Sequence, residues 1–265
     1  MKHHRTTAAV LLAAAVITAA TGCGTTTDAG TKPAATPSKQ TDPFTGLTAA
    51  QIELEARTAT AAASSLRMNG TIYADGQSID VNLALDTKGN CVGKLAPGEL
   101  GTLDIIKNGP TVYLQGDERF WRNSLASAKR NSMPRAQSDA LIAKFQGKWI
   151  KATPAMAKAM GTNVCDLSRL TDILDGDGGL NPDVKRGADI TENGQPVAVV
   201  YEREAGSDEV TTIHVAKKGK PYPLRVITTG GIDDGDLYFS DFDQPVDATP
   251  PRPGQLLDPT KTAGV

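Results

Sequence analysis

Residues 79–85 read IDVNLAL, and an apolar side chain stands at every second position. Successive side chains of a β-strand point to opposite faces, so this spacing predicts a strand with one apolar and one polar face. A similar alternation precedes it in residues 68–74 and follows it in residues 103–114, LDIIKNGPTVYL. The Asn108-Gly109 dipeptide in that last stretch is a strong signal for a hairpin turn. Residues 68–114 are therefore predicted to form an antiparallel meander.

Helical patterns lie on both sides of this meander. Thr48-Ala49-Ala50-Gln51 has the T-x-x-Q form of a capping box and predicts the start of a helix. Two further helices are predicted near residues 118–125 and 134–145, and strands return between residues 188 and 242. The order helix, strands, helices, strands favours an α+β fold built on a single curved antiparallel sheet.

The N-terminus has the features of an export signal. Lys2 and Arg5 precede an apolar run of about 13 residues, which is too short to cross a bilayer. The run ends in Ala20-Thr21-Gly22-Cys23, which resembles a bacterial lipobox with alanine in place of the usual leucine. The resemblance implies that residues 1–22 are a lipoprotein signal peptide and that Cys23 carries a lipid anchor with acyl chains such as palmitate. A plain secretory signal with an incidental cysteine is the alternative.

The mature chain is expected to have three parts. Residues 23–46 are rich in Thr, Gly, Ala and Pro without hydrophobic periodicity, which predicts a lipidated, flexible tether. Residues 47–250 form the folded domain, and the proline-rich residues 251–265 are expected to be a disordered tail. We therefore expect a monomer held by its anchor at the extracytoplasmic face of the cell membrane.

Two cysteines remain if Cys23 is lipidated, namely Cys91 and Cys165. In an exported protein a disulfide between them is the economical interpretation. Two buried free thiols and a metal site are the alternatives, although two cysteines without a neighbouring histidine make a poor zinc site.

Composition and motifs argue against several kinds of chemistry. The chain has 28 basic and 30 acidic residues, so it lacks the excess of positive charge that a nucleic-acid partner would require. His214 is the one histidine outside the signal segment, and its place in a strand predicts a surface residue and not a catalytic one, since no G-x-S-x-G motif accompanies it. The acidic loops at residues 175–179 and 233–236 lack the full pattern of a calcium loop. We expect no enzymatic activity, no metal and no cofactor.

The apolar face of the sheet is the remaining candidate for function. If the helices that cover it leave a space, that space would bind a hydrophobic ligand. If they do not, the same side chains form a filled core. The candidate lining residues are Ile79, Val81, Leu83, Leu103, Ile105, Val112 and Leu114, with Phe120 and Trp121 at the edge.

Two short motifs resemble the actinobacterial LppX/LprG-type lipoproteins. One is S-x-R-x-x-G-T at residues 65–71, and the other is F-S-D-F-x-x-P-V at residues 239–246. That family is similar to the LolA/LolB carriers, which have a strongly curved antiparallel sheet, a half-barrel, whose concave face is covered by helices. The resemblance implies that the protein binds, or carries, an acyl lipid in a cavity between sheet and helices at the cell envelope. The alternative is a non-enzymatic interaction or sensor module with a filled core and a protein partner.

Overall fold

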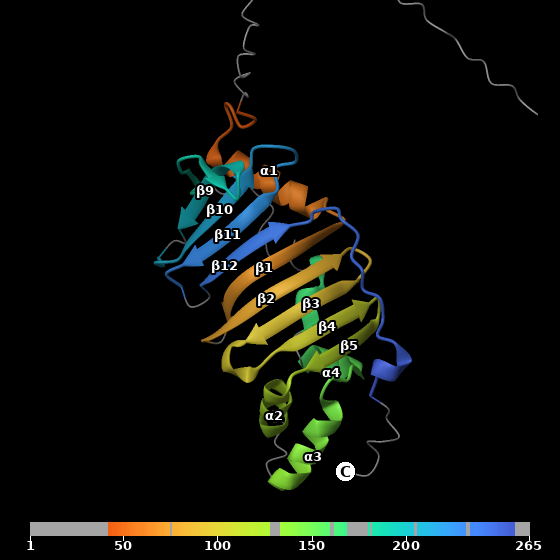
Figure 1. Cartoon of the computed structure of the whole chain (residues 1–265). Coiled ribbons are helices and arrows are strands. Elements are labelled where there is room, and N and C mark those ends of the chain that lie inside the picture. Colours follow the sequence, from red (N-terminus) through yellow and green to blue (C-terminus); the bar gives the residue numbers. More distant parts are fainter. Residues whose placement is uncertain are drawn as a thin grey trace, which may run out of the picture. The chain divides into compact units, whose positions relative to one another are not determined.

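The computed structural model describes residues 42–257, except 75, 128–132, 160–161, 169–179, 181, 204–205 and 232–233. Its centre is one open antiparallel sheet of 12 strands in the order β6-β5-β4-β3-β2-β1-β12-β11-β10-β9-β7, with β8 also paired to β9 (Figure 1). The predicted α+β fold with a single curved sheet is confirmed. The predicted signal peptide, Cys23, the tether up to residue 41 and the acidic loop at 175–179 lie outside the described residues.

The strands follow the predicted meander and extend it. They are β1 (Ser65–Ala74), β2 (Gln77–Asp86), β3 (Cys91–Pro97), β4 (Leu103–Asn108), β5 (Thr111–Gly116), β6 (Ile150–Lys151), β7 (Lys185–Arg186), β8 (Ile190–Glu192), β9 (Gln195–Arg203), β10 (Val210–Ala216), β11 (Pro223–Thr229) and β12 (Gly235–Ser240). β3 was not predicted from the sequence, because it contains a glycine and ends in a proline, so its alternation is weak.

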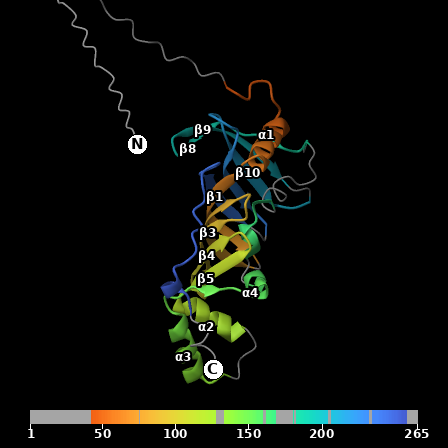
Figure 2. The ribbon, with the colours of Figure 1, turned by 90° about the vertical axis from the view of Figure 1, so that its right-hand side faces the viewer.

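Four α-helices accompany the sheet within the described part of the chain. They are α1 (Ala49–Ala61), α2 (Glu118–Ser127), α3 (Arg135–Phe145) and α4 (Pro154–Ala159), together with the 3₁₀ turns η1 (Gly98–Leu100), η2 (Thr162–Cys165) and η3 (Pro253–Gln255). The predicted capping box is present, because Thr48 and Gln51 each accept a hydrogen bond from the backbone N–H of the other. Figure 2 shows α1 and α4 on the same side of the sheet.

Two glycines inside strands let neighbouring strands approach where a side chain would collide. Gly93 of β3 has φ +151°, and a Cβ built there would lie 1.9 Å from the carbonyl oxygen of Asn82 in β2. Gly70 of β1 has φ +150°, and its Cβ would lie 2.0 Å from the carbonyl oxygen of Asp236 in β12. Glycine within a strand marks a bend or a close approach of another backbone, and both positions sit in the central strands of the curved sheet.

Replacing Gly93 by alanine is expected to destabilise the domain by more than about 2 kcal/mol, because the backbone conformation is strained for an L-residue and the new methyl group meets backbone and not a mobile side chain. Urea unfolding of Gly93→Ala measures the change. Gly254→Ala is the matched control, since no atom lies within 4 Å of its added Cβ. Equal midpoints for the two variants would contradict this role of Gly93.

β1 and β12, the first and last strands in the sequence, pair with each other at the centre of the sheet. β1 and β12 run antiparallel from Arg67 opposite Ser240 to Ile72 opposite Gly235. Side chains of the two sequence motifs fasten this pairing: Arg67 Nε donates to Asp241 Oδ2 at 3.0 Å, and Ser65 Oγ donates to the carbonyl of Gln244 at 2.5 Å. The motifs that suggested the family are therefore two sides of one strand pair.

The folded part extends beyond both boundaries expected from the sequence. Phe44 is buried with α1, and Asp42 forms an ion pair with Lys217 at 2.9 Å, so residues 42–46 belong to the domain. At the other end, the backbone N–H of Trp149 donates to the Gln255 carbonyl at 2.9 Å, and Leu257 N–H donates to the Trp149 carbonyl at 2.8 Å. These bonds fix residues 251–257 to the domain. Residues 258–265 lie outside the described part.

Asp243 ties β12 to its surroundings with an acidic side chain. It accepts hydrogen bonds from Lys220 Nζ, from the backbone N–H of Ser64 and from the Tyr222 hydroxyl. The Lys220 ammonium first, and then the Ser64 and Tyr222 donors, hold the pKa of Asp243 well below its usual range. Lys217 and Arg225 likewise lower the pKa values of Asp42 and Asp236.

Carboxyl groups with lowered folded-state pKa values stabilise the domain above their unfolded pKa, which is about 3.9, and lose this contribution as the pH falls through the folded values. We expect the free energy of unfolding to be level between about pH 5 and pH 7 and to fall below about pH 4. Asp243→Asn should be less stable at neutral pH and should show a shallower fall in acid. Asp208→Asn, a side chain that is 98% exposed, is the control and should follow the parent curve.

Candidate functional site: the helix-covered face of the sheet

The sheet has an apolar inner face, which carries the helices, and a polar outer face. One row of directly opposed residues crosses the inner face from β12 to β6: Phe239, Met68, Leu83, Gly93, Ile105, Leu114 and Ile150. Residues one position away, such as Arg67 and Asn82, point to the outer face, where Arg67 donates to the Asn82 amide oxygen at 2.9 Å. The predicted alternation therefore places apolar side chains on the inner face and polar side chains on the outer face.

The structure gathers the nine predicted lining residues in one hydrophobic cluster on this inner face. Val81, Leu83, Leu103, Ile105, Val112, Leu114, Phe120 and Trp121 are buried, and Ile79 is partly buried against them. Four clefts among the described residues have volumes of about 360 to 710 Å³, and of the nine residues only Val81 lines one of them. In this structure these residues pack as core, and their contact with a ligand stays a prediction.

The inner face carries two separate hydrophobic clusters. One joins β1–β5 to α2 and to the segment around α4, and the other joins α1 to β9 and β10. Central strands also carry apolar side chains that are only partly buried, most of them packed against the first cluster and one against the second. We call these residues the apolar strip: Ile72, Ile79, Ile213, Val226 and Leu237. Val226 lies directly opposite both Ile213 and Leu237, so the strip is continuous across β10, β11 and β12.

An aromatic group closes the β5 end of the inner face. The ring centroids of Phe120 and Trp121 in α2 are 5.3 Å apart, and those of Trp121 and Phe145 in α3 are 5.1 Å apart. The indole Nε1 of Trp121 is buried and has no hydrogen-bond partner among the described residues. An unsatisfied buried donor costs about 1–3 kcal/mol, so this N–H is a ready donor for a polar atom that enters the inner face.

Cys91 and Cys165 form a disulfide, as predicted from the cysteine count, and both are fully buried. Cys91 begins β3 and Cys165 ends η2, so the bond fastens the segment after α4 to the inner face of the sheet. The two alternatives, free thiols and a metal site, are excluded. The bond fixes one part of the helical layer, while the described residues of α1 carry no disulfide and join the sheet only through the backbone that leads to β1.

Removing the bond in Cys91→Ala/Cys165→Ala is expected to lower the free energy of unfolding by about 2–5 kcal/mol, because the unfolded chain is freed of a long closed loop. Guanidinium unfolding with and without reductant measures this. Reductant should lower the midpoint of the parent protein and leave the double variant unchanged. A parent midpoint that does not respond to reductant would show that the bond does not constrain the unfolded chain.

A cleft of about 460 Å³ opens where α1, the β2–β3 turn and the disulfide segment meet. Its lining includes Ala63 after α1, Lys88 in the turn, Lys107 of β4 and Cys165. Lys107 Nζ donates to the Gly89 carbonyl at 2.8 Å. Asp86 and Asp166 line the cleft beside the two lysines, so its charged side chains are of both signs, and Cys165 and Leu167 give it a buried apolar wall. The cleft could not be predicted from the sequence because its parts come from four separate segments.

His214 differs from its prediction as a surface residue. It lies on the outer face, as its register indicated, but it is only 5% exposed. Its Nδ1 is 3.0 Å from Glu192 Oε2, and Arg225 NH1 lies 3.5 Å from the same oxygen. The ion pairs that surround it come from β8 and β11, and single-strand periodicity does not reveal such neighbours. The residues that the structure describes contain no group of three potential metal ligands.

The fold of this chain is similar to that of a solved structure. The crystal structure of LprF from Mycobacterium bovis is similar over 77% of this chain and 96% of its own, with 13% identity and a TM-score of 0.51. The chain has the fold of LprF. A Mycobacterium tuberculosis lipoprotein, LppX, is similar over 76% of this chain and 98% of its own, with 12% identity and a TM-score of 0.46.

The expected resemblance to LppX/LprG-type lipoproteins is thus confirmed at the level of fold. No protein-family model matches the sequence, and neither does any curated protein. Among the described helices, none is both long and apolar enough to cross a membrane.

Proposed function

We propose that this protein is a membrane-anchored, extracytoplasmic lipoprotein that binds, and carries, an acyl lipid between the sheet and its helices without catalysing a reaction. The observation that carries the proposal is the apolar strip, a set of only partly buried apolar side chains that pack against the two clusters on the covered face of an LprF-like fold. Cys23 would hold the protein to the membrane, and the segment that follows would let the domain reach away from it.

An acyl chain lying along the apolar strip would be stabilised by removal of apolar surface from water, at about 25 cal/mol per Å². Each buried CH₂ contributes about 0.8 kcal/mol, so a long chain gains enough to bind without specific polar contacts. The headgroup would lie at the cleft between α1 and the disulfide segment, where two lysines and two aspartates offer hydrogen-bond donors and acceptors to a polar headgroup.

An acyl chain on the inner face would need space between the sheet and its helices. The disulfide keeps the segment after α4 on β3, so we expect the lipid to enter by displacement of α1, whose contact with the sheet is made largely through small side chains such as Ala50 and Ala56. Small side chains bury little area per residue, so moving this helix costs less than moving the aromatic group of α2 and α3.

The test is native mass spectrometry, with solvent extraction, of the full chain purified in detergent from the envelope of its own host. We expect a lipid bound at one per protein that survives removal of the detergent. A protein that stays ligand-free when acyl phospholipid is offered would overturn the proposal and favour a module with a filled core and a protein partner.

A matched pair of variants locates the ligand. Val226→Trp fills part of the apolar strip and should reduce bound lipid severalfold. Ile227→Trp places the same side chain on the outer face one residue away and should retain the parent amount. Circular dichroism checks that both fold. Equal loss in both variants, or in neither, would place the lipid elsewhere.

A further inference from the structure

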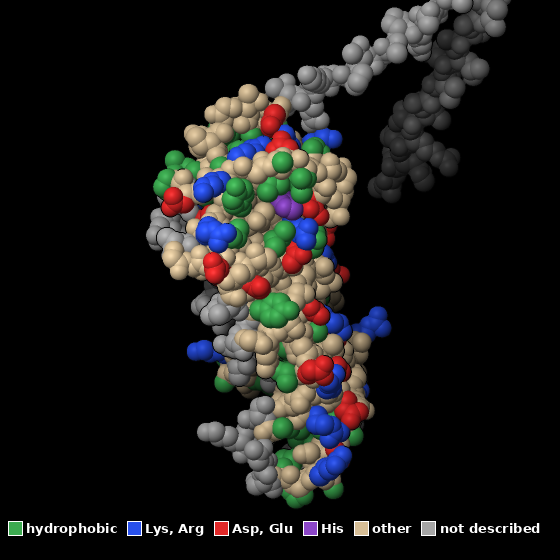
Figure 3. Space-filling view, turned by 90° about the vertical axis from the view of Figure 1, so that its left-hand side faces the viewer, with side chains coloured by type: hydrophobic (Ala, Val, Ile, Leu, Met, Phe, Trp, Pro, Cys, Tyr) green, Lys and Arg blue, Asp and Glu red, His purple; other side chains and the backbone are tan. Residues whose placement is uncertain are grey.

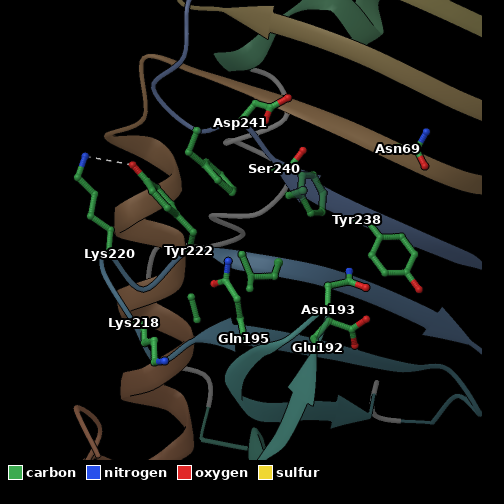
Figure 4. A pocket seen from close by; sticks show the side chains of 14 residues that line it. Asn69, Glu192, Asn193, Gln195, Lys218, Lys220, Tyr222, Tyr238, Ser240 and Asp241 are labelled. Carbon is green, nitrogen blue, oxygen red and sulfur yellow. Dashed lines mark hydrogen bonds between the residues drawn. The ribbon is translucent and has the colours of Figure 1, made fainter. Parts of the chain in front are cut away.

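The largest cleft among those described lies on the outer face, remote from the covered side, and has a volume of about 710 Å³. It runs between the β8–β9 turn, the end of β12 and the segment before β11 (Figure 4). This volume is within the range of about 300–1,000 Å³ that is typical of small-molecule sites. The lipid hypothesis makes no use of this cleft.

Side-chain amides and a hydroxyl line this cleft without internal hydrogen bonds. Among the described residues, Asn69, Asn193, Gln195 and Ser240 have no side-chain partner, and Figure 4 shows Asn193 and Gln195 facing Tyr238 and Tyr222 across the cleft. Asn193 has φ +48°, a left-handed conformation that is uncommon outside glycine. The Asn193-Gly194 turn thus fixes an amide at the rim.

Aromatic rings form the other part of the lining. Tyr222 and Phe242 stack face to face, with ring centroids 3.8 Å apart and planes at 3°. Tyr238 lies beside Asn69 across the β1–β12 pair, and the Arg225 guanidinium sits 4.7 Å from its ring centroid. Arg225 is itself bound to Asp236 through two hydrogen bonds, so the guanidinium that contacts the Tyr238 ring is fixed in place.

The charges of the lining nearly balance, and most are already paired. Glu192 pairs with His214 and Arg225, Asp241 pairs with Arg67, and Lys220 pairs with Asp243. Figure 3 shows acidic and basic side chains interspersed over one side of the molecule, with no broad area of one sign. A nucleic acid or a strongly acidic partner would require a basic field that this lining does not provide.

We propose that this cleft binds a saccharide. Amide groups donate and accept at once, as the hydroxyl pairs of a sugar ring require, and flat aromatic surfaces pack against its C–H face. An apolar ligand would leave the amides of Asn69, Asn193 and Gln195 desolvated without partners, so it is disfavoured here. The protein then holds two ligand surfaces of different chemistry on opposite faces of one sheet.

The test is saturation-transfer NMR of the full chain in detergent with the methyl glycosides of glucose, mannose, galactose, arabinose and N-acetylglucosamine and with their trimers. We expect at least one sugar to receive transfer from the protein, with the signal strongest at ring C–H protons that face an aromatic ring. Absence of transfer to every sugar in this panel would overturn the proposal. Binding of acyl lipid, measured separately, is independent of this outcome.

Variants assign the signal to the cleft. Asn193→Gly/Gln195→Ala removes two amides while glycine accepts the left-handed turn, and the affinity should fall about tenfold or more. Tyr238→Leu keeps apolar volume but removes the ring and should also weaken binding. Gln77→Ala, an exposed amide of β2 outside the cleft, should bind as the parent does. Unchanged binding in both cleft variants would place the sugar elsewhere and overturn the proposal.

Discussion

The pairing of β1 with β12 is the constraint on which the rest of the structure depends. It joins strands from opposite ends of the folded chain and turns two meanders, β1–β6 and β7–β12, into one continuous sheet. Arg67 with Asp241 and Ser65 with Gln244 fasten the end of the pair where β1 begins and β12 ends, and Gly70 permits the backbone approach at its middle. The apolar strip crosses this pair on one face and the outer cleft lies beside it on the other, so both candidate sites depend on it.

The disulfide and the helices cover the inner face of the sheet, and the helices differ in how firmly they are attached to it. The segment around α4 is covalently attached to β3, and α2 and α3 are packed through large aromatic rings. By contrast, α1 rests on β9 and β10 mainly through alanine and one isoleucine, Ile52. Local opening of the lightly covered half therefore costs less free energy than opening of the other half.

Much of the fold could be predicted from the sequence, because local patterns decide it. Period-two apolar spacing predicted β2, β4 and β5, the T-x-x-Q sequence predicted the start of α1, and the cysteine count predicted the disulfide. Features that depend on distant neighbours could not be predicted. The burial of His214 depends on Glu192 and Arg225, the docking of residues 251–257 depends on Trp149, and the outer cleft is assembled from four separate segments. Whether the inner face is filled or hollow is likewise a matter of packing that alternation alone cannot decide.

The central strand pair also has a consequence for how the chain matures. Strands β1 and β12 are separated by more than 160 residues, so β1 has only one of its two neighbours until almost all of the domain has emerged. A chain is synthesised from the N-terminus onward, and the meander β1–β5 would meanwhile expose an unpaired central edge and an uncovered apolar face. Chains cut short before residue 235 would keep that edge permanently, which makes truncated forms targets for proteases and for association through β1.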